Sequence, residues 1–267
     1  MPRPTAATRR PDRNRPLPVR SVPPRRVLDW LALGWRDLVR VPAPSLLHGV
    51  LVALGGWTTA GLAAYLPWLA PGAFSAFVIV GPVLCTGLYE LSRLLARGAT
   101  PGFAAVTNAW ARDSRPLVRL GLVLLALAAT WVVASAALFV AFLREPPATP
   151  LAFLRYVLVG QGDLLFALWL VLGGLVAAAV YAVGAVSPPL LLGRRIGFRR
   201  ALLTSVRAVG DNPVTMGLWG VLILVATALS LASGMLGFVV AVPWIGHATW
   251  HAYRDLVVTD DVPLRYE

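Results

Sequence analysis

The chain has no lysine and few charged residues of any kind, and this scarcity limits the class of protein it can be. Charged residues make up 13% of the 267 positions, against about 25% in a typical soluble domain. Apolar residues make up 58%. The single cysteine, Cys85, excludes an internal disulfide. Together these features exclude an ordinary soluble domain and favour a protein that resides in a lipid bilayer.

The 24 basic residues are all arginine, and the formal net charge is +12. In a soluble protein this excess would suggest a nucleic-acid partner. Here the arginines alternate with long apolar stretches instead of forming one face, so no nucleic acid is expected. The phosphates that they meet are predicted to be those of anionic lipid headgroups.

Six segments almost without charge are each long enough to cross a bilayer as a helix, which takes about 20 residues. They are Ser45–Leu66, Ala73–Leu94, Leu120–Phe142, Leu164–Val186 and two spans within Val214–Tyr253. The last stretch is too long for one helix, and Ser233-Gly234 is the expected turn. The predicted fold class is therefore all-α, a polytopic membrane helix bundle with six transmembrane helices.

The arginines are divided unequally between the two ends of these spans. Ten lie in Met1–Pro44, five in Arg93–Arg119, five in Arg194–Asn212 and two after Tyr253, whereas the opposite side has only Arg144 and Arg155. Arginine-rich loops stay in the cytoplasm. The N- and C-termini are therefore both expected to be cytoplasmic.

The predicted membrane domain is residues 27–258, with a tail at each end. Residues 1–26 contain eight arginines and seven prolines but no apolar run. They do not resemble a cleavable signal, and they are predicted to form a disordered Arg/Pro-rich cytoplasmic tail. Residues 259–267 are predicted to form a second, short cytoplasmic tail.

Three segments between the spans have a helical period with one polar face. In Arg26–Val41 the polar sector contains Arg26, Asp29, Arg36, Asp37 and Arg40. Phe198–Asp211 has a comparable pattern and Phe103–Arg112 a weaker one. Two interpretations are open: helices lying in the headgroup layer, or helices packed on the cytoplasmic surface of the bundle. Each segment leads into a hairpin of two spans, which favours three repeated helical hairpins with interfacial helices.

The chain offers little catalytic chemistry. It contains no nucleophile–base–acid spacing, no glycine-rich phosphate loop and no cysteine pair. An enzyme is therefore not expected, and no catalytic residue is assigned. Almost nothing ionisable lies near the middle of the spans, which argues against a proton-coupled pump but leaves a pore for neutral solutes open.

Two clusters near the cytoplasmic boundary are candidate interaction or ligand sites. Glu90 and Arg93 are three residues apart, which favours an ordinary ion pair that snorkels to the surface; alternatively, Glu90 pairs with another helix. His247 and His251 lie one turn apart on one face, followed by Arg254. Further metal ligands at motif spacing are missing, so no metal or cofactor is assigned. Hydrogen bonding between helices is the favoured interpretation, and Glu90 and His251, equivalent in the repeat, are hypothesised to meet.

Several short motifs are distinctive enough to compare with known families. They are Gly81-Pro82, Gly87–Arg93, Ala185–Pro188, Ala208-Val209, Asn212-Pro213 and the closing Gly246–Arg254. The set resembles an uncharacterised bacterial integral-membrane family, the domain of unknown function numbered 2189, over about residues 27–258. The resemblance implies a six-span bundle in the inner (cytoplasmic) membrane. It implies no activity, so no residue inherits a role from it.

The expected function is that of a non-enzymatic accessory or scaffold protein of the cell envelope. Its arginine-rich face is expected to meet anionic lipid or a membrane or cytoplasmic protein partner. Two alternatives are open. One is a transporter or channel for a small neutral or amphiphilic solute, and the other is a metal- or haem-binding membrane protein that uses His247 and His251.

Overall fold

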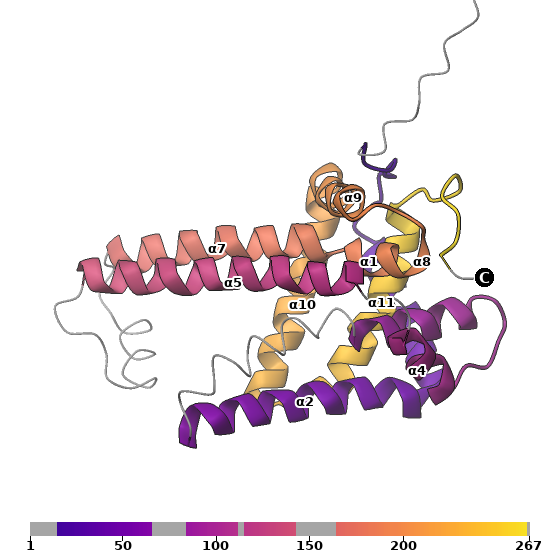
Figure 1. The fold of residues 1–267 in the computed structure, drawn as a ribbon, viewed down its shortest axis with the longest axis horizontal. Helices are drawn as coiled ribbons and strands as arrows, with labels where there is room; N and C mark the ends of the chain where they lie inside the picture. Colours follow the sequence, from indigo (N-terminus) through magenta and orange to yellow (C-terminus); the bar gives the residue numbers. More distant parts are fainter. Residues whose placement is uncertain (1–14, 66–83, 112–114, 143–163, 266–267) are drawn as a thin grey trace, which may run out of the picture.

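The structure, a computed structural model, describes residues 15–65, 84–111, 115–142 and 164–265 (Figure 1). Its helices are α1 (Arg26–Arg40), α2 (Pro42–Tyr65), α4 (Phe103–Ala111), α5 (Arg115–Phe142), α7 (Leu164–Gly184), α8 (Ser187–Gly193), α9 (Phe198–Asp211), α10 (Pro213–Ala232) and α11 (Phe238–Leu256). Residues 84–95 are also helical and are called helix 84–95 below. Within the described ranges, β-type pairing is limited to two isolated bridges. The prediction of an all-α fold is confirmed.

Four stretches of the described chain are helical, long and apolar enough to cross a membrane. They are Pro42–Leu62 in α2, Arg115–Ala134 in α5, Leu164–Gly193 through α7 and α8, and Pro213–Ala232 in α10. Only 6% to 22% of each apolar window is buried inside the protein. So much exposed apolar surface is unfavourable in water, and lipid around these helices removes the cost. A helical membrane bundle is therefore the fold class.

The two remaining predicted spans differ in how much of them the structure describes. Half of Ala73–Leu94, residues 73–83, lies outside the described residues, and the other half belongs to helix 84–95. The sixth predicted span corresponds to α11, which is not among the four apolar spans because its second half contains polar side chains such as His247, His251 and Arg254. The expected turn before α11 is confirmed, since α10 ends at Ala232 and Gly234 adopts φ +63°.

Helix α1 packs closely against the second half of α11. A Cβ atom on Gly34 would lie 2.6 Å from the Ala248 nitrogen, so the two helices touch through their backbones. Asp255 at the end of α11 accepts hydrogen bonds from Arg26 Nη2 at 2.6 Å and from Trp30 Nε1 at 2.7 Å. The Asp255 carboxylate raises the pKa of Arg26. Of the two interpretations open for this segment, packing on the bundle is the one observed.

The buried face of α1 differs from the predicted one. It consists of Val27, Trp30, Gly34, Asp37 and Leu38. Asp37 belongs to the polar sector of the helical period, yet it is only 6% exposed, so this sector is not exposed throughout. The period separates polar from apolar residues but does not show that a polar residue has polar partners inside the bundle. The apolar Leu28, Trp35 and Val39 are exposed instead.

Residues 15–25, called the N-terminal strap below, are packed against the bundle. Leu17 is 2% exposed, and its backbone N–H donates to Thr204 Oγ1 in α9 at 3.0 Å. The Val22 N–H donates to Asn212 Oδ1 at 2.8 Å, and Val19 forms a bridge with Val257. The prediction of a disordered tail is therefore wrong for residues 15–26, because the apolar side chains of Leu17 and Val22 pack into the hydrophobic core of the bundle. Residues 1–14 lie outside the described part.

The predicted short C-terminal tail also folds back onto the bundle. Leu264 forms a bridge with Arg194, just after α8. The Arg265 N–H donates to the Gly193 carbonyl at 3.1 Å, and Val262 is 5% exposed. Both ends of the described chain are therefore held against α8, α9 and the end of α11.

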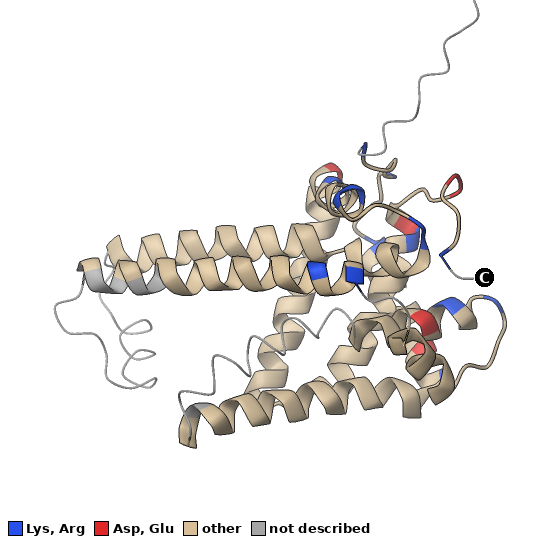
Figure 2. Cartoon of the chain, viewed as in Figure 1, with Lys and Arg blue, Asp and Glu red and all other residues tan. Residues whose placement is uncertain are grey.

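Basic residues gather at one end of the molecule, called the basic end below. Figure 2 shows them around α8, α9, the first turns of α5 and the C-terminus, whereas the bodies of α2, α5, α7 and α10 extend away almost without charge. Helices α2, α5 and α10 all begin after or within an arginine-bearing segment. This separation of charge from apolar length is what the arginine count along the sequence predicted.

Candidate functional site

Five polar side chains form a continuous buried chain of hydrogen bonds, called the polar junction below. They are Ser45 in α2, His247 and His251 in α11, Ser92 in helix 84–95 and Asp37 in α1. Ser45, Ser92 and His247 are 0% exposed. The polar junction therefore connects the consecutive helices α1 and α2 with helix 84–95 and with α11, which are distant from them in sequence.

The distances in the polar junction are all short. His247 Nε2 lies 2.9 Å from Ser45 Oγ, and His247 Nδ1 lies 2.7 Å from Ser92 Oγ. Ser92 Oγ lies 2.7 Å from Asp37 Oδ2. His251 Nε2 lies 2.8 Å from the same carboxylate oxygen. Every one of these contacts is within hydrogen-bonding range.

The positions of the protons follow from the chemistry of the groups. An ionised carboxylate only accepts, so Ser92 and His251 both donate to Asp37. Ser92 has then used its only proton and accepts from His247 Nδ1. Ser45 Oγ lies 2.7 Å from the Val41 carbonyl as well as near His247 Nε2. While His247 is neutral, its Nε2 and the Val41 carbonyl compete for the single Ser45 proton; when the ring is protonated, Nε2 donates to Ser45 Oγ and the hydroxyl donates to the carbonyl.

Asp37 stays ionised although it is buried. Burial by itself would raise the pKa of this carboxyl, but hydrogen bonds from His251 and Ser92 and the nearby histidines outweigh it. The pKa of Asp37 therefore lies below its usual range. An ionised Asp37 is the acceptor that orients the other members of the polar junction.

The polar junction lacks the arrangement of a serine nucleophile. In a Ser-His-Asp triad the histidine lies in the middle and takes the serine proton. Here Ser92 lies in the middle and donates its hydrogen bond to the carboxylate, and its side chain is closed off from solvent. The arrangement is suited to holding helices together.

Glu90 and Arg93 form the ion pair that their spacing predicted. Arg93 Nε and Nη2 donate to the two Glu90 oxygens, each at 2.7 Å. The pair does not snorkel to the surface, however, because the side chains are only 9% and 2% exposed. Helix 84–95 is covered by its neighbours at this point, so a surface position was the wrong expectation. His251, hypothesised to meet Glu90, contacts Asp37.

The two candidate histidines have separate partners, and Arg254 lines a pocket described below. Both ring nitrogens of His247 are bonded to serine hydroxyls. Within the described residues, no group of three or more His, Cys, Asp or Glu side chains could hold a metal ion. A third histidine, His48, lies beside the polar junction and donates from Nδ1 to the Pro44 carbonyl at 2.8 Å.

Lipid-exposed apolar helices, a basic end and a buried polar junction together define a helical integral membrane protein. The chain matches the family described as predicted integral membrane protein (DUF2189) over residues 69–193. The resemblance read from the sequence motifs is confirmed over that range, which includes Ser92, Glu90 and Arg93. It does not extend to the closing motif Gly246–Arg254, and Asp37 and Ser45 also lie outside it. No curated protein and no solved structure matches the chain.

Proposed function

We propose that this protein is a non-enzymatic accessory or scaffold protein of the bacterial inner membrane, with both termini in the cytoplasm. The observation that supports it most strongly is the separation of arginines from apolar helix bodies (Figure 2). Basic segments are retained on the cytoplasmic side of a membrane. The basic end then faces the cytoplasm, and the far ends of α2 and α5 face outward.

The proposed membrane topology has six spans arranged as three hairpins. The order of elements supports it: a short helix, a long apolar helix and a returning helix recur as α1, α2 and helix 84–95, then α4, α5 and α7, then α9, α10 and α11. In this topology α11 is the sixth span. Its polar second half lies at the cytoplasmic boundary, where α1 covers it.

A scaffold role is favoured by how the polar groups are used. Both ring nitrogens of His247 and the hydroxyls of Ser45 and Ser92 are bonded within the protein, and Ser92 has no exposed surface. A rigid junction of this kind fixes the positions of four helices. It presents a constant cytoplasmic face without supplying a reacting group.

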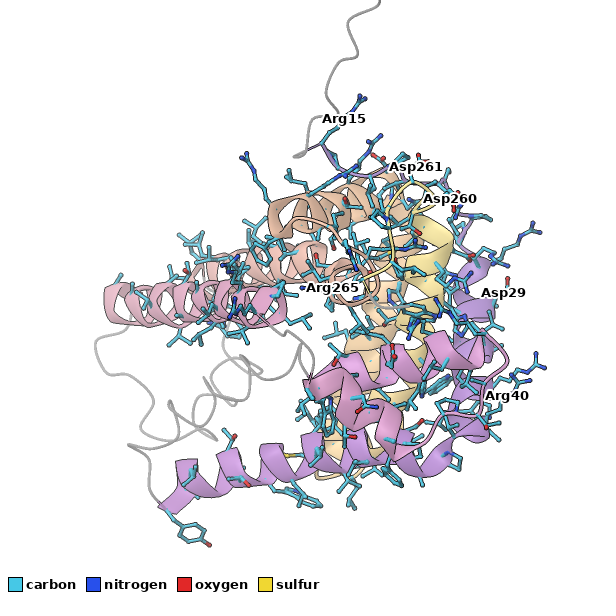
Figure 3. All side chains as sticks on the ribbon, turned by 45° about the vertical axis from the view of Figure 1, so that its right-hand side comes forward. Arg15, Asp29, Arg40, Asp260, Asp261 and Arg265 are labelled. Atoms are coloured by element: carbon cyan, nitrogen blue, oxygen red, sulfur yellow. The ribbon has the colours of Figure 1, made fainter. Side chains whose placement is uncertain are left out.

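Anionic lipid headgroups are the proposed partners of the exposed arginines. Arg36 and Arg40 are exposed on α1, and Arg40 points away from the bundle in Figure 3. Each such arginine near an anionic leaflet contributes about 1 kcal/mol of attraction. A protein partner at the same face would add to this interaction.

The test is the lipid composition of discs cut directly from native membranes with an amphipathic polymer. We expect anionic lipid to be enriched around the full-length protein relative to the whole membrane. The double variant R36Q/R40Q should lower the enrichment, and the matched variant R36K/R40K should preserve it, because it keeps the charge. Equal composition for all three proteins would contradict the lipid contact.

The scaffold role has a separate test in sealed liposomes. We expect the reconstituted protein to leave glycerol and erythritol permeability at the level of protein-free liposomes. A protein-dependent flux would contradict the scaffold role and favour the transporter or channel for neutral solutes.

A further inference from the structure

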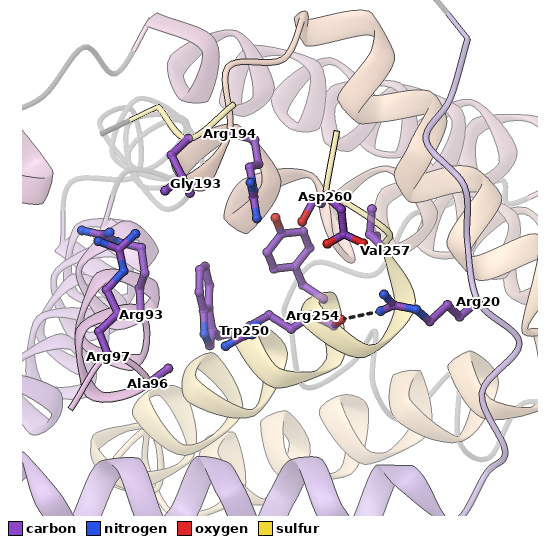
Figure 4. A pocket seen from close by; sticks show the side chains of 13 residues that line it. Arg20, Arg93, Ala96, Arg97, Gly193, Arg194, Trp250, Arg254, Val257 and Asp260 are labelled. Carbon is purple, nitrogen blue, oxygen red and sulfur yellow. Dashed lines mark hydrogen bonds between the residues drawn. The ribbon is translucent and has the colours of Figure 1, made fainter. Parts of the chain in front are cut away.

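We propose that a pocket at the basic end binds a phosphate group. The pocket has a volume of about 400 Å³, which is within the usual range of small-molecule sites. Five arginines line it: Arg20, Arg93, Arg97, Arg194 and Arg254 (Figure 4). They come from the N-terminal strap, helix 84–95 and the turn after it, the segment after α8, and α11. The fold brings these arginines together, and their spacing in the sequence does not predict that they meet.

Positive charge in the pocket is poorly compensated. Among the described residues, only Arg93 of the five has a carboxylate partner, which is Glu90. Arg20 and Arg194 each donate to main-chain carbonyls, and a neutral carbonyl leaves the guanidinium charge in place. Asp260 is the one carboxylate among the described lining residues. An anion in the pocket would relieve the repulsion between these guanidinium groups.

Two buried donors that line the pocket have no hydrogen-bond partner. They are Arg93 Nη1 and Trp250 Nε1, the first from a residue 8% exposed and the second from one 5% exposed. Glu90 occupies Nε and Nη2 of Arg93, so Nη1 is the nitrogen left over. Buried polar atoms in native proteins nearly always have a partner. A ligand oxygen reached by a small side-chain rotation would supply the missing acceptor.

The donors favour phosphate over other anions. Guanidinium forks match the oxygens of phosphate, and charge-assisted bonds of this kind are stronger than neutral ones. The pocket offers several such forks, with the Trp250 indole N–H and the Tyr253 ring alongside them. The volume leaves room for the group to which the phosphate is attached. A phosphate ester or inorganic phosphate therefore suits the site better than a simple carboxylate.

The phosphate has two potential sources, a lipid headgroup and a free phosphate in the cytoplasm. The lipid source rests on the proposed function, because it requires the basic end to face anionic headgroups. The free source does not. Arg254 marks the cytoplasmic boundary predicted for α11, and the pocket is at that depth.

The experiment measures thermal unfolding of the full-length protein in nanodiscs of phosphatidylcholine alone. One arm titrates inorganic phosphate against chloride at constant ionic strength, and the other adds phosphatidic acid to the discs. R97Q/R254Q removes two exposed arginines of the pocket. R195Q/R199Q is the matched control, since it removes two exposed arginines that do not line the pocket. W250F keeps the ring and removes the unpartnered indole N–H.

We expect saturable stabilisation of the wild type and an apparent affinity weaker by about tenfold or more in R97Q/R254Q. W250F should weaken binding by a smaller factor, and R195Q/R199Q should bind like the wild type. Stabilisation by inorganic phosphate identifies a free phosphate, and stabilisation by phosphatidic acid alone identifies a lipid headgroup. No saturable effect in either arm, or equal weakening in R195Q/R199Q, would overturn the pocket. The lipid enrichment proposed above depends on Arg36 and Arg40 and can survive that result.

Discussion

At the scale of single residues, Asp37 is the group on which the candidate site depends. Its carboxylate accepts hydrogen bonds from Ser92 and His251, and Ser92 in turn accepts one from His247. Hydrogen bonds to a charged group contribute about 1.5–3 kcal/mol each. Removing the charge therefore weakens two bonds directly and leaves His247 without a fixed proton arrangement.

We predict that D37N lowers stability at pH 7 by roughly 3 kcal/mol, because an amide replaces an ionised acceptor of two hydrogen bonds. The pKa of Asp37 is lower in the folded protein, so its contribution is present above the unfolded value and is lost as the pH falls. The unfolding curves of wild type and D37N should therefore converge below about pH 4. Thermal unfolding in detergent from pH 7 to pH 3 measures this.

The matched control is D29N, whose carboxylate is exposed on the same helix and should matter little. A D37N protein as stable as wild type at pH 7, or a gap that persists unchanged at pH 3, would contradict the role assigned to Asp37.

Sequence reasoning recovered part of the site at this scale. His247 and His251 were expected to hydrogen-bond between helices, and they do. Asp37 and Ser92 were missed because their partners lie on helices far away in sequence. The available signal was the spacing of Trp30, Gly34 and Asp37, in which a small residue on a helix face indicates close packing on that same face.

At the scale of elements, the N-terminal strap and α1 close the basic end. Asn212 accepts from the Val22 N–H at 2.8 Å and donates to the Arg20 carbonyl at 3.1 Å. Thr215 Oγ1 donates to the Val22 carbonyl at 2.6 Å. The backbone N–H and the carbonyl of Val22 are therefore both hydrogen-bonded, the first to Asn212 and the second to Thr215.

We predict that N212A loosens the N-terminal strap without disturbing α11. Each lost bond to a buried backbone group costs about 1 kcal/mol, so local opening of residues 17–22 should rise by roughly tenfold or more. Trypsin cleavage after Arg20 and hydrogen–deuterium exchange of the strap measure it.

N108A provides the control for the strap, since it makes the same substitution at Asn108, which is exposed on α4. If wild type, N108A and N212A are all cleaved after Arg20 at one rate, the strap is not held by Asn212.

The elements divide into those that length and hydropathy predict and those that need tertiary contacts. The long helices and the turn at Ser233-Gly234 follow from apolar length and a glycine. The ordered strap was not predicted because its composition is dominated by arginine and proline. Leu17 and Val22 are held in place by contacts with α9 and with Asn212 between α9 and α10. The buried side of α1 was missed because helical periodicity cannot identify a packing partner.

At the scale of the whole molecule, the distribution of charge is the feature that sequence and structure share. Arginines lie at or just before the starts of α2, α5 and α10 and around both ends of the described chain (Figure 2). Charge is expensive inside hydrocarbon and inexpensive at its boundary. This one physical rule was enough to predict a membrane bundle. It does not predict the polar junction or the arginine-lined pocket at the basic end.

The most direct test of the account is which side of the membrane the basic end faces. In a C85A background, single cysteines replace exposed residues as D29C on α1, D211C on α9 and Y65C at the end of α2. An impermeant maleimide is applied to intact spheroplasts and to opened membranes. The account predicts that Y65C is labelled in intact spheroplasts, whereas D29C and D211C are labelled only after opening. Labelling of D29C and D211C on opposite sides, or of Y65C together with both on one side, would contradict it.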